Sequence, residues 1–254
     1  MSSIYLPVFQ SNAASDAADL LPRLLGGNVS LNDTLSFCRL CRIRGIAGLF
    51  LDGMGEPLHR ELCRSGRALL HILPRMGDEK NATGRLFPFL DAVAAGDREC
   101  ARAIAAIARA TWNPDEEYED DFLYVRFLMT HMLTGADVTK CADLLDRWGA
   151  VLDGASDVRF DLCCALLQHV APDFEEALVS LLDEEKARYR RLSRAGALAQ
   201  EIEATEANLS IEGIALVRVA RANGLPVRSS YWGVPSLALK DVPAAFSDAA
   251  WQSV

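Results

Sequence analysis

The sequence predicts an all-α protein, an irregular stack of antiparallel helical hairpins with about ten helices. Three observations support this. Apolar residues recur at helical spacing along most of the chain, and no segment shows the alternation that is typical of a strand. Helix starts near residues 115, 137, 156 and 172 recur about every 20 residues, which gives two-helix units of solenoid size. The spacing carries no repeat signature, so the stack is expected to be irregular.

The segment 210–224 is predicted to be the central, buried helix. Ser210 is a good N-cap, and Gly224 suits the left-handed position after the last turn. Pro226 then prevents the helix from continuing. Apolar residues lie on almost every side of this segment, so the helix needs neighbours on almost every side.

The N-terminal half is predicted to begin with an extended lead-in over 1–13. Four helices then start at capping residues or at a first-turn proline, namely Ser15 or Asp16, Ser30, Pro57 and Asp97, and a short helix covers 86–95. The polar segment 76–84 is the clearest loop. It is a candidate subdivision of a chain that we interpret as a single helical domain over 1–254.

The C-terminal half continues the pattern. Helices are expected from about 115 to Gly135, from Asp137, from Ser156 or Asp157, and from Pro172 to a weak point near Gly196. The tail after 227 is expected to be an ordered, irregular segment lying on the helices, because its aromatic and apolar content suits burial better than exposure. Its marked residues are Tyr231, Trp232, Pro235, Pro243, Phe246 and Trp251.

The composition of the chain argues against some classes of function. The net charge of −9 argues against direct binding of nucleic acid or of an anionic membrane, both of which need basic surface. Seven cysteines, an odd number mostly inside apolar helical segments, suit reduced thiols in a cytoplasmic protein. No secretory signal and no apolar run of membrane-spanning length is present.

The sequence offers few candidates for chemistry. Cys38 and Cys41 have the CxxC spacing of a zinc knuckle, but a second pair is missing and the segment reads as a helix, so buried packing competes with metal or redox use. The four histidines lie outside any metalloprotease motif, and no nucleophile elbow or phosphate-binding loop occurs. We therefore expect no enzymatic activity, no cofactor and no metal.

The acidic run, defined here as residues 115–121, is the most unusual feature, with six carboxylates in seven positions. Charge at a helix N-terminus explains the first few of them. Divalent-metal binding is a second interpretation, although the spacing does not match a calcium loop. A surface that faces a basic protein partner is the third, and Tyr118 and Tyr124 are aromatic residues of the kind that interfaces favour.

The C-terminal part of the chain resembles a known family. The acid-rich helix, the segment SIEGIALVRVARANGL and a Tyr-containing tail with VPS at 234–236 are similar to the immunity protein 49 family, mainly over residues 115–238. The resemblance implies a helical, cytoplasmic antidote that binds one cognate bacterial toxin, often a nuclease delivered by a secretion system. Its motifs are structural, so it transfers no toxin-contacting residue.

The sequence thus predicts an immunity protein that occludes the active or substrate-binding surface of a toxin, with a basic nuclease delivered by type VI secretion as the expected class. There are two alternatives. The first is a helical-repeat adaptor, and the less favoured one is a metal-dependent hydrolase. The residues predicted to contact the toxin are Glu116, Glu117, Tyr118, Asp120, Asp121, Tyr124, Tyr231 and Trp232. The last two are included because one acidic helix end cannot supply a tight interface by itself.

Overall fold

The structure, a computed structural model, describes residues 4–26, 30–77, 81–133, 138–241, 247 and 249–253 of the 254-residue chain. The predicted all-α class is confirmed, because helices dominate and the only β feature of these residues is an isolated bridge between Tyr231 and Val234. The helices are α1 (Leu6–Leu25), α2 (Leu31–Asp52), α3 (Glu56–Ile72), α4 (Pro88–Ala95), α5 (Arg98–Ile107), α6 (Glu119–Leu133), α7 (Val138–Leu152), α8 (Val158–Gln168), α9 (Ala171–Arg194), α10 (Gln200–Ala204) and α11 (Ile211–Ala222).

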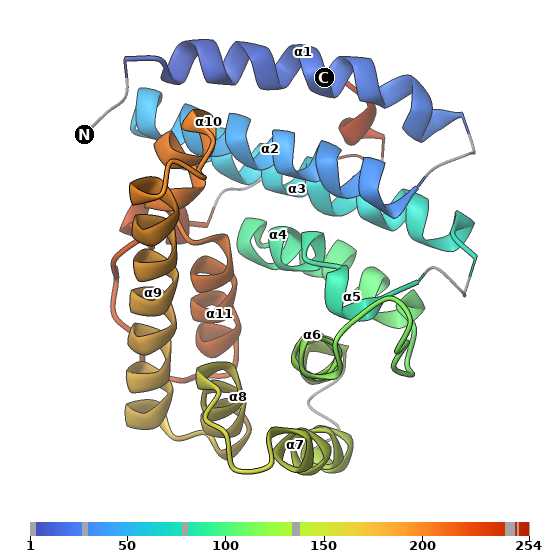
Figure 1. The fold of residues 1–254 in the computed structure, drawn as a ribbon, viewed down its shortest axis with the longest axis vertical. Coiled ribbons are helices and arrows are strands. Elements are labelled where there is room, and N and C mark those ends of the chain that lie inside the picture. Colours follow the sequence, from blue (N-terminus) through green and yellow to red (C-terminus); the bar gives the residue numbers. More distant parts are fainter. Residues whose placement is uncertain are drawn as a thin grey trace.

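The helices pack largely as consecutive pairs (Figure 1). α1, α2 and α3 form one layer, in which each helix contacts the next, and α4 packs against α3. α6 contacts α7, and α8 contacts α9. α9 and α11 lie side by side and run across the direction of α1 to α3, and α11 packs on α4 (Figure 1). The C-terminal helices therefore close onto the N-terminal layer rather than extending the stack.

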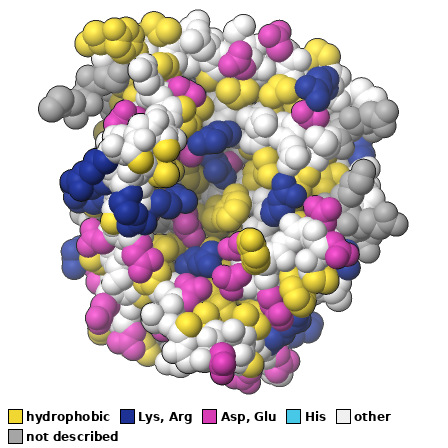
Figure 2. All heavy atoms as spheres, in the orientation of Figure 1, with side chains coloured by type: hydrophobic (Ala, Val, Ile, Leu, Met, Phe, Trp, Pro, Cys, Tyr) yellow, Lys and Arg dark blue, Asp and Glu magenta, His cyan; other side chains and the backbone are white. Residues whose placement is uncertain are grey.

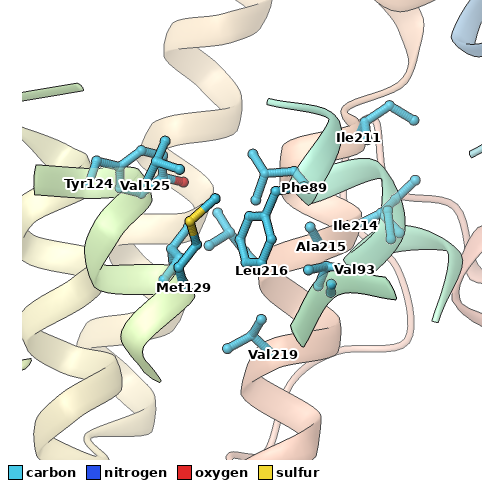
Figure 3. Close-up of a cluster of buried hydrophobic side chains, with 14 of the residues drawn as sticks. Phe89, Val93, Tyr124, Val125, Met129, Ile211, Ile214, Ala215, Leu216 and Val219 are labelled. Atoms are coloured by element: carbon cyan, nitrogen blue, oxygen red, sulfur yellow. The ribbon is translucent and has the colours of Figure 1, made fainter. Parts of the chain in front are cut away.

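Both caps predicted for α11 are present. The hydroxyl of Ser210 accepts a 3.0 Å hydrogen bond from the N–H of Gly213. Gly224 adopts a left-handed φ of 77°, and Leu225 closes the end by donating its N–H to the carbonyl of Ala220. The central buried position is also confirmed. Side chains of α11 meet those of α4 and α6 in one apolar cluster, as Figure 3 shows.

Gly213 explains how closely the neighbours approach α11. A Cβ atom at this position would lie 2.7 Å from Cδ2 of Leu182 on α9 and 2.8 Å from Cγ2 of Val234 in the tail. Because real Cβ atoms do not come so close to other carbon atoms, a glycine is required for α9 and the tail to pack against α11 at this level.

Five other predicted helix starts are confirmed. Ser30, Asp97 and Asp157 accept hydrogen bonds from backbone N–H groups of the first turns of α2, α5 and α8. Pro57 lies in the first turn of α3, and Pro172 lies in the first turn of α9. The predicted break at Gly196 is also present, because this residue has a φ of 64° directly after α9.

Three predicted boundaries were wrong. The lead-in is helical, since α1 begins at Leu6, with Pro7 in its first turn. α5 ends at Ile107 instead of continuing to Trp112, and α6 begins at Glu119 after a turn that contains most of the preceding acidic residues. The predictions for Gly135, Asp137, Pro243 and Phe246, and those for 1–3 and 78–80, lie outside the described residues.

The main hydrophobic core draws residues from both sides of the 76–84 segment, from Leu31 to Leu239. A second cluster lies between α1, α2 and α3, and Trp251 of the tail inserts into it. The Trp251 ring lies 6.2 Å from that of Phe37 and 4.8 Å from that of His71, centroid to centroid. The single-domain interpretation stays a prediction. None of the described helices has the length and apolar character needed to cross a membrane.

Candidate functional site

The acidic run is divided between a turn and a helix start. In the turn, the N–H groups of Glu116 and Glu117 both donate to the carbonyl of Asn113 at 3.1 Å. Glu119, Asp120 and Asp121 then occupy the first turn of α6, where the helix dipole stabilises negative charge. The local interpretation as helix N-terminal charge therefore accounts for three of the six carboxylates.

Glu117 points into the protein. Its carboxylate accepts hydrogen bonds from the N–H groups of Gly84 and Asn113, the latter at 3.2 Å. Burial raises the pKa of Glu117, although these backbone hydrogen bonds lower it again. Gly84 belongs to the 3-10 segment η3 (Thr83–Arg85), so Glu117 ties this segment to the turn before α6. The Glu117 side chain therefore stabilises this part of the fold and offers little surface to a partner.

Three arginines pair with four of the five other carboxylates of the run. Arg159 of α8 lies 2.9 Å from a carboxylate oxygen of Asp121 and 3.6 Å from one of Asp120. Arg147 of α7 lies 2.6 Å from Glu119, and Arg85 lies 3.5 Å from Glu116. The negative charge of the run is therefore partly compensated by a network of ion pairs that connects α6 with α7, α8 and η3.

The two tyrosines of this region have opposite environments. Tyr118 is 80 % exposed, whereas Tyr124 has no exposed area. The Tyr124 hydroxyl donates to Oε1 of Glu212 at 2.6 Å, and the Arg159 guanidinium lies 5.2 Å from the centre of its ring. Tyr118 can meet a partner directly, while in this conformation Tyr124 supports the surface from beneath.

Tyr231 and Trp232 lie against α9, away from the contacts of the acidic run. The Tyr231 hydroxyl donates to Oε2 of Glu175 at 2.6 Å, and Lys186 lies 5.0 Å from the centre of the Trp232 ring. Both rings are half-buried. Among the described residues, they share no hydrogen bond, ion pair or ring contact with the acidic run, so the structure does not bring the two predicted groups into one patch.

A central cleft of about 700 Å³ opens beside the acidic run. Figure 2 shows this face hollowed at its centre, where arginine and acidic side chains border hydrophobic ones. Asp121 is the only predicted site residue that lines the cleft. The other charged residues that line it are Arg42, Arg159, Glu184, Glu185, Arg188, Arg191, Glu206 and Glu212, and apolar lining comes from Phe87, Leu90, Leu181, Leu209 and Ile211. Because these residues come from positions 42 to 212, no local sequence pattern could have identified the cleft.

Two acids at or near the cleft, Asp91 and the half-buried Glu185, have raised pKa values. Asp91, below it, is fully buried and pairs with Arg42 at 2.7 Å, and it accepts a hydrogen bond from Ser65. Burial raises the pKa of Asp91, although Arg42 and Ser65 oppose the rise. Burial also raises the pKa of Glu185 to about 7; a hydrogen bond with Ser210 lowers it, and the charge of Glu212 raises it further. The cleft therefore holds a carboxyl group that titrates near neutrality.

The described residues give no support to metal or redox chemistry at the CxxC pair. Cys38 donates its thiol to the carbonyl of Ser65 at 3.4 Å, and burial raises its pKa to about 12. Cys41 is fully buried, and burial raises its pKa as well. Within the described ranges, no three histidine, cysteine or acidic side chains are grouped so that they could hold a metal ion.

Comparison with known proteins adds one match. The family model described as Immunity protein 49 matches residues 51–232, which is more than half of the chain. No curated protein and no solved structure matches. The matched range contains the acidic run, most residues of the central cleft, and both Tyr231 and Trp232.

Proposed function

Because the chain belongs to the immunity protein 49 family, we propose that it binds one cognate bacterial toxin and neutralises it by covering the toxin's active or substrate-binding surface. The observation that carries this proposal is the family match over residues 51–232. That range includes every residue predicted to contact the toxin, from Glu116 to Trp232. The protein acts by binding and performs no catalysis of its own.

The toxin is proposed to be a nuclease that reaches the cytoplasm through a secretion system of the type VI class. A nuclease must present basic surface to hold phosphates. An inhibitor with a net charge of −9 is electrostatically matched to such a surface, and attraction between opposite charges speeds the encounter. The same charge disfavours direct binding of the nucleic acid substrate by the inhibitor.

The toxin-binding surface is proposed to combine the rim formed by the acidic run with the mouth of the central cleft. An antidote needs tight binding, and nanomolar affinity corresponds to about −12 kcal/mol. Interfaces of that strength bury about 1,600 Å² in total, more than one helix end provides. The cleft supplies concave area with apolar lining beside the rim, and Asp121 belongs to both.

Within this surface, Tyr118 is proposed as the aromatic anchor, because its side chain is 80 % exposed. Asp115, Glu116 and Asp120 are the acidic residues most available to a basic partner. Tyr231 and Trp232 remain proposed contacts of a second patch on α9, which a large toxin could reach together with the first.

Co-expression tests the proposal. The gene beside the one encoding this chain is expressed alone and together with it, and growth and complex formation are measured. We expect that the neighbour's product arrests growth, that this chain restores it, and that the two proteins co-purify. Absence of both rescue and complex would remove the immunity function. Digestion of DNA and RNA by the purified toxin, with and without this chain, then tests the nuclease class.

A helical-repeat adaptor remains the second candidate, because α1, α2 and α3 stack in sequence as adaptor repeats do. Two results together would favour the adaptor: the chain captures a single, non-toxic helical or peptide partner, and it fails to restore growth against the toxin of any neighbouring gene.

A further inference from the structure

A second cavity, of about 450 Å³, lies where α11 meets the ends of α4, α5 and α6, and none of its lining residues comes from α9. Four arginines line it: Arg98 and Arg102 from α5, and Arg218 and Arg221 from α11. His131 of α6 also lines the cavity, and Asp241 is its only acidic lining residue among the described ones. Four arginines, of which Arg218 is partly buried and the other three are exposed, thus line one cavity in a protein whose net charge is −9.

Asp241 compensates this positive charge only weakly. It lies 3.1 Å from Nη1 of Arg218, but its side chain is 98 % exposed, so water screens the pair. Burial lowers the pKa of Arg218; Asp241 raises it, and the nearby charges of Arg221 and Arg98 lower it again. Like charges held together at a partly buried site raise the free energy of the folded state unless an anion joins them.

Part of the donor capacity of the cavity is already used. The Nη atoms of Arg218 donate to Asp241 and to the carbonyls of Ala238 and Lys240, and the exposed Arg102 and Arg221 donate to backbone carbonyls. Nε of Arg218, however, is buried and makes no hydrogen bond among the described residues, and the exposed Arg98 guanidinium pairs with no other described residue. His131 is only 7 % exposed, and its Nδ1 also lacks a hydrogen-bond partner. Buried polar atoms are normally satisfied, so two unpartnered buried nitrogen atoms at one cavity, the donor Nε of Arg218 among them, indicate a missing hydrogen-bonding group.

We infer that this cavity binds a small organic phosphate. The paired N–H groups of arginine match the geometry of phosphate oxygens. A phosphate group carries about −1.5 to −2 charges, so it balances the excess positive charge of the lining residues better than one carboxylate does. A bare phosphate ion would leave most of the cavity empty. Most of the remaining wall is apolar, formed by Val93, Met132, Val219, Ala222 and Leu239, with the polar Asn223 among them, and it suits the organic part of such a ligand.

The test is calorimetric titration of the purified chain with AMP as the probe, at constant ionic strength. Tricarballylate, a tricarboxylate without phosphate, is the comparison ligand. The variant Arg98→Gln/Arg221→Gln removes two exposed guanidinium groups from the cavity. Arg190→Gln/Arg194→Gln removes the same charge from the exposed side of α9 and is the matched control. Circular dichroism and thermal melting confirm that both variants are folded.

We expect saturable binding of one AMP per chain, competition by inorganic pyrophosphate, and weakening of at least about tenfold in the cavity variant only. Met132→Glu, which places a carboxylate at the cavity wall, should weaken binding as well. Three results would each overturn the inference: no saturable binding at millimolar AMP, equal weakening in the α9 control, or tricarballylate binding as tight as AMP. None of these measurements requires the toxin.

Discussion

The hydroxyl of Tyr124, in the middle of α6, donates a 2.6 Å hydrogen bond to the carboxylate of Glu212 in the first turn of α11. The ring of Tyr124 is fully buried, and Arg159 lies over it while pairing with Asp121. One tyrosine thus connects the acidic run, the central cleft and the start of the buried central helix. The rim proposed for toxin binding is held in place by the core.

Replacing Tyr124 with phenylalanine is expected to lower the free energy of unfolding by about 2 kcal/mol, because the half-buried Glu212 carboxylate loses a hydrogen bond from a fully buried hydroxyl. Urea denaturation measures the change. Tyr118→Phe removes the same hydroxyl from an 80 % exposed ring and should change stability by less than about 0.5 kcal/mol. Equal effects of the two substitutions would show that the Tyr124 hydrogen bond contributes nothing.

Glu185 gives a pH-dependent prediction. Its pKa is about 7 in the folded protein, against an ordinary value of 4.5, so the folded state holds the proton more tightly than the unfolded chain. Stability contributed by this proton is present below pH 4.5 and is lost as the pH rises toward 7. Glu185→Gln, which keeps a neutral side chain, should therefore stabilise the protein by about 1–3 kcal/mol at about pH 8.

The control for this measurement is Glu184→Gln, a change at the exposed neighbouring residue. Urea midpoints of both variants are compared with the parent chain at about pH 5 and about pH 8. The advantage of Glu185→Gln should shrink at the lower pH, where the parent glutamate is largely protonated. A constant difference at both pH values would assign the effect to packing instead.

Gly84 should not tolerate a side chain. A Cβ atom there would lie 2.8 Å from the backbone N of Phe122 and from the carbonyl carbon of Asp121, and backbone atoms cannot yield as a flexible side chain can. Gly84→Ala is expected to cost about 1–3 kcal/mol and to loosen the start of α6. Gly77→Ala, which meets nothing within 4 Å, is the control and should leave the thermal midpoint nearly unchanged.

Charge reversal at the exposed end of the acidic run tests electrostatic steering. Asp115→Lys/Glu116→Lys should slow association with the toxin about tenfold at low ionic strength and flatten its dependence on salt. Stability should change by less than about 1 kcal/mol, because both residues are exposed and the ion pair that is lost, between Glu116 and Arg85 at 3.5 Å, is exposed as well. Asp173→Lys/Glu176→Lys makes the same change of net charge on α9. If stopped-flow rates fall equally for both variants, overall charge and not the acidic run controls the encounter.

Tyr118→Ala tests the aromatic anchor. Loss of an interface tyrosine typically costs at least about 1.4 kcal/mol, which corresponds to a tenfold weaker Kd for the toxin. The Tyr118 side chain is 80 % exposed, so stability should hardly change. Met54→Ala, at another exposed apolar residue, provides the comparison. An unaltered Kd in the Tyr118 variant would place the toxin elsewhere on the molecule.

The helix class and most helix starts could be predicted because they depend on local chemistry. Ser30, Asp97, Asp157 and Ser210 cap helices through their own side chains, and a capping residue is visible in sequence. The start of α1 was missed because the buried side of its middle part consists of Ala13 and Ala17, which give a weak hydrophobic signal. Pro7 in its first turn was the available sign.

The functional surface could be predicted only in part. The acidic run is contiguous in sequence, yet its pairing with Arg85, Arg147 and Arg159 depends on how α7, α8 and η3 pack against α6. The burial of Tyr124 beside the exposed Tyr118 follows from the true start of α6, which lies four residues after the predicted one. Both cavities depend on residues far apart in the chain.

The seven cysteines have a practical consequence. None of them forms a disulfide in the described part of the chain; six are buried, while Cys164 on α8 is half-exposed. A thiol-reactive fluorophore should therefore label the folded protein first at Cys164, in mildly alkaline buffer because burial raises the pKa of this thiol. The dye would lie on α8, the helix whose Arg159 pairs with the acidic run. Its fluorescence could therefore report complex formation without any substitution in the chain.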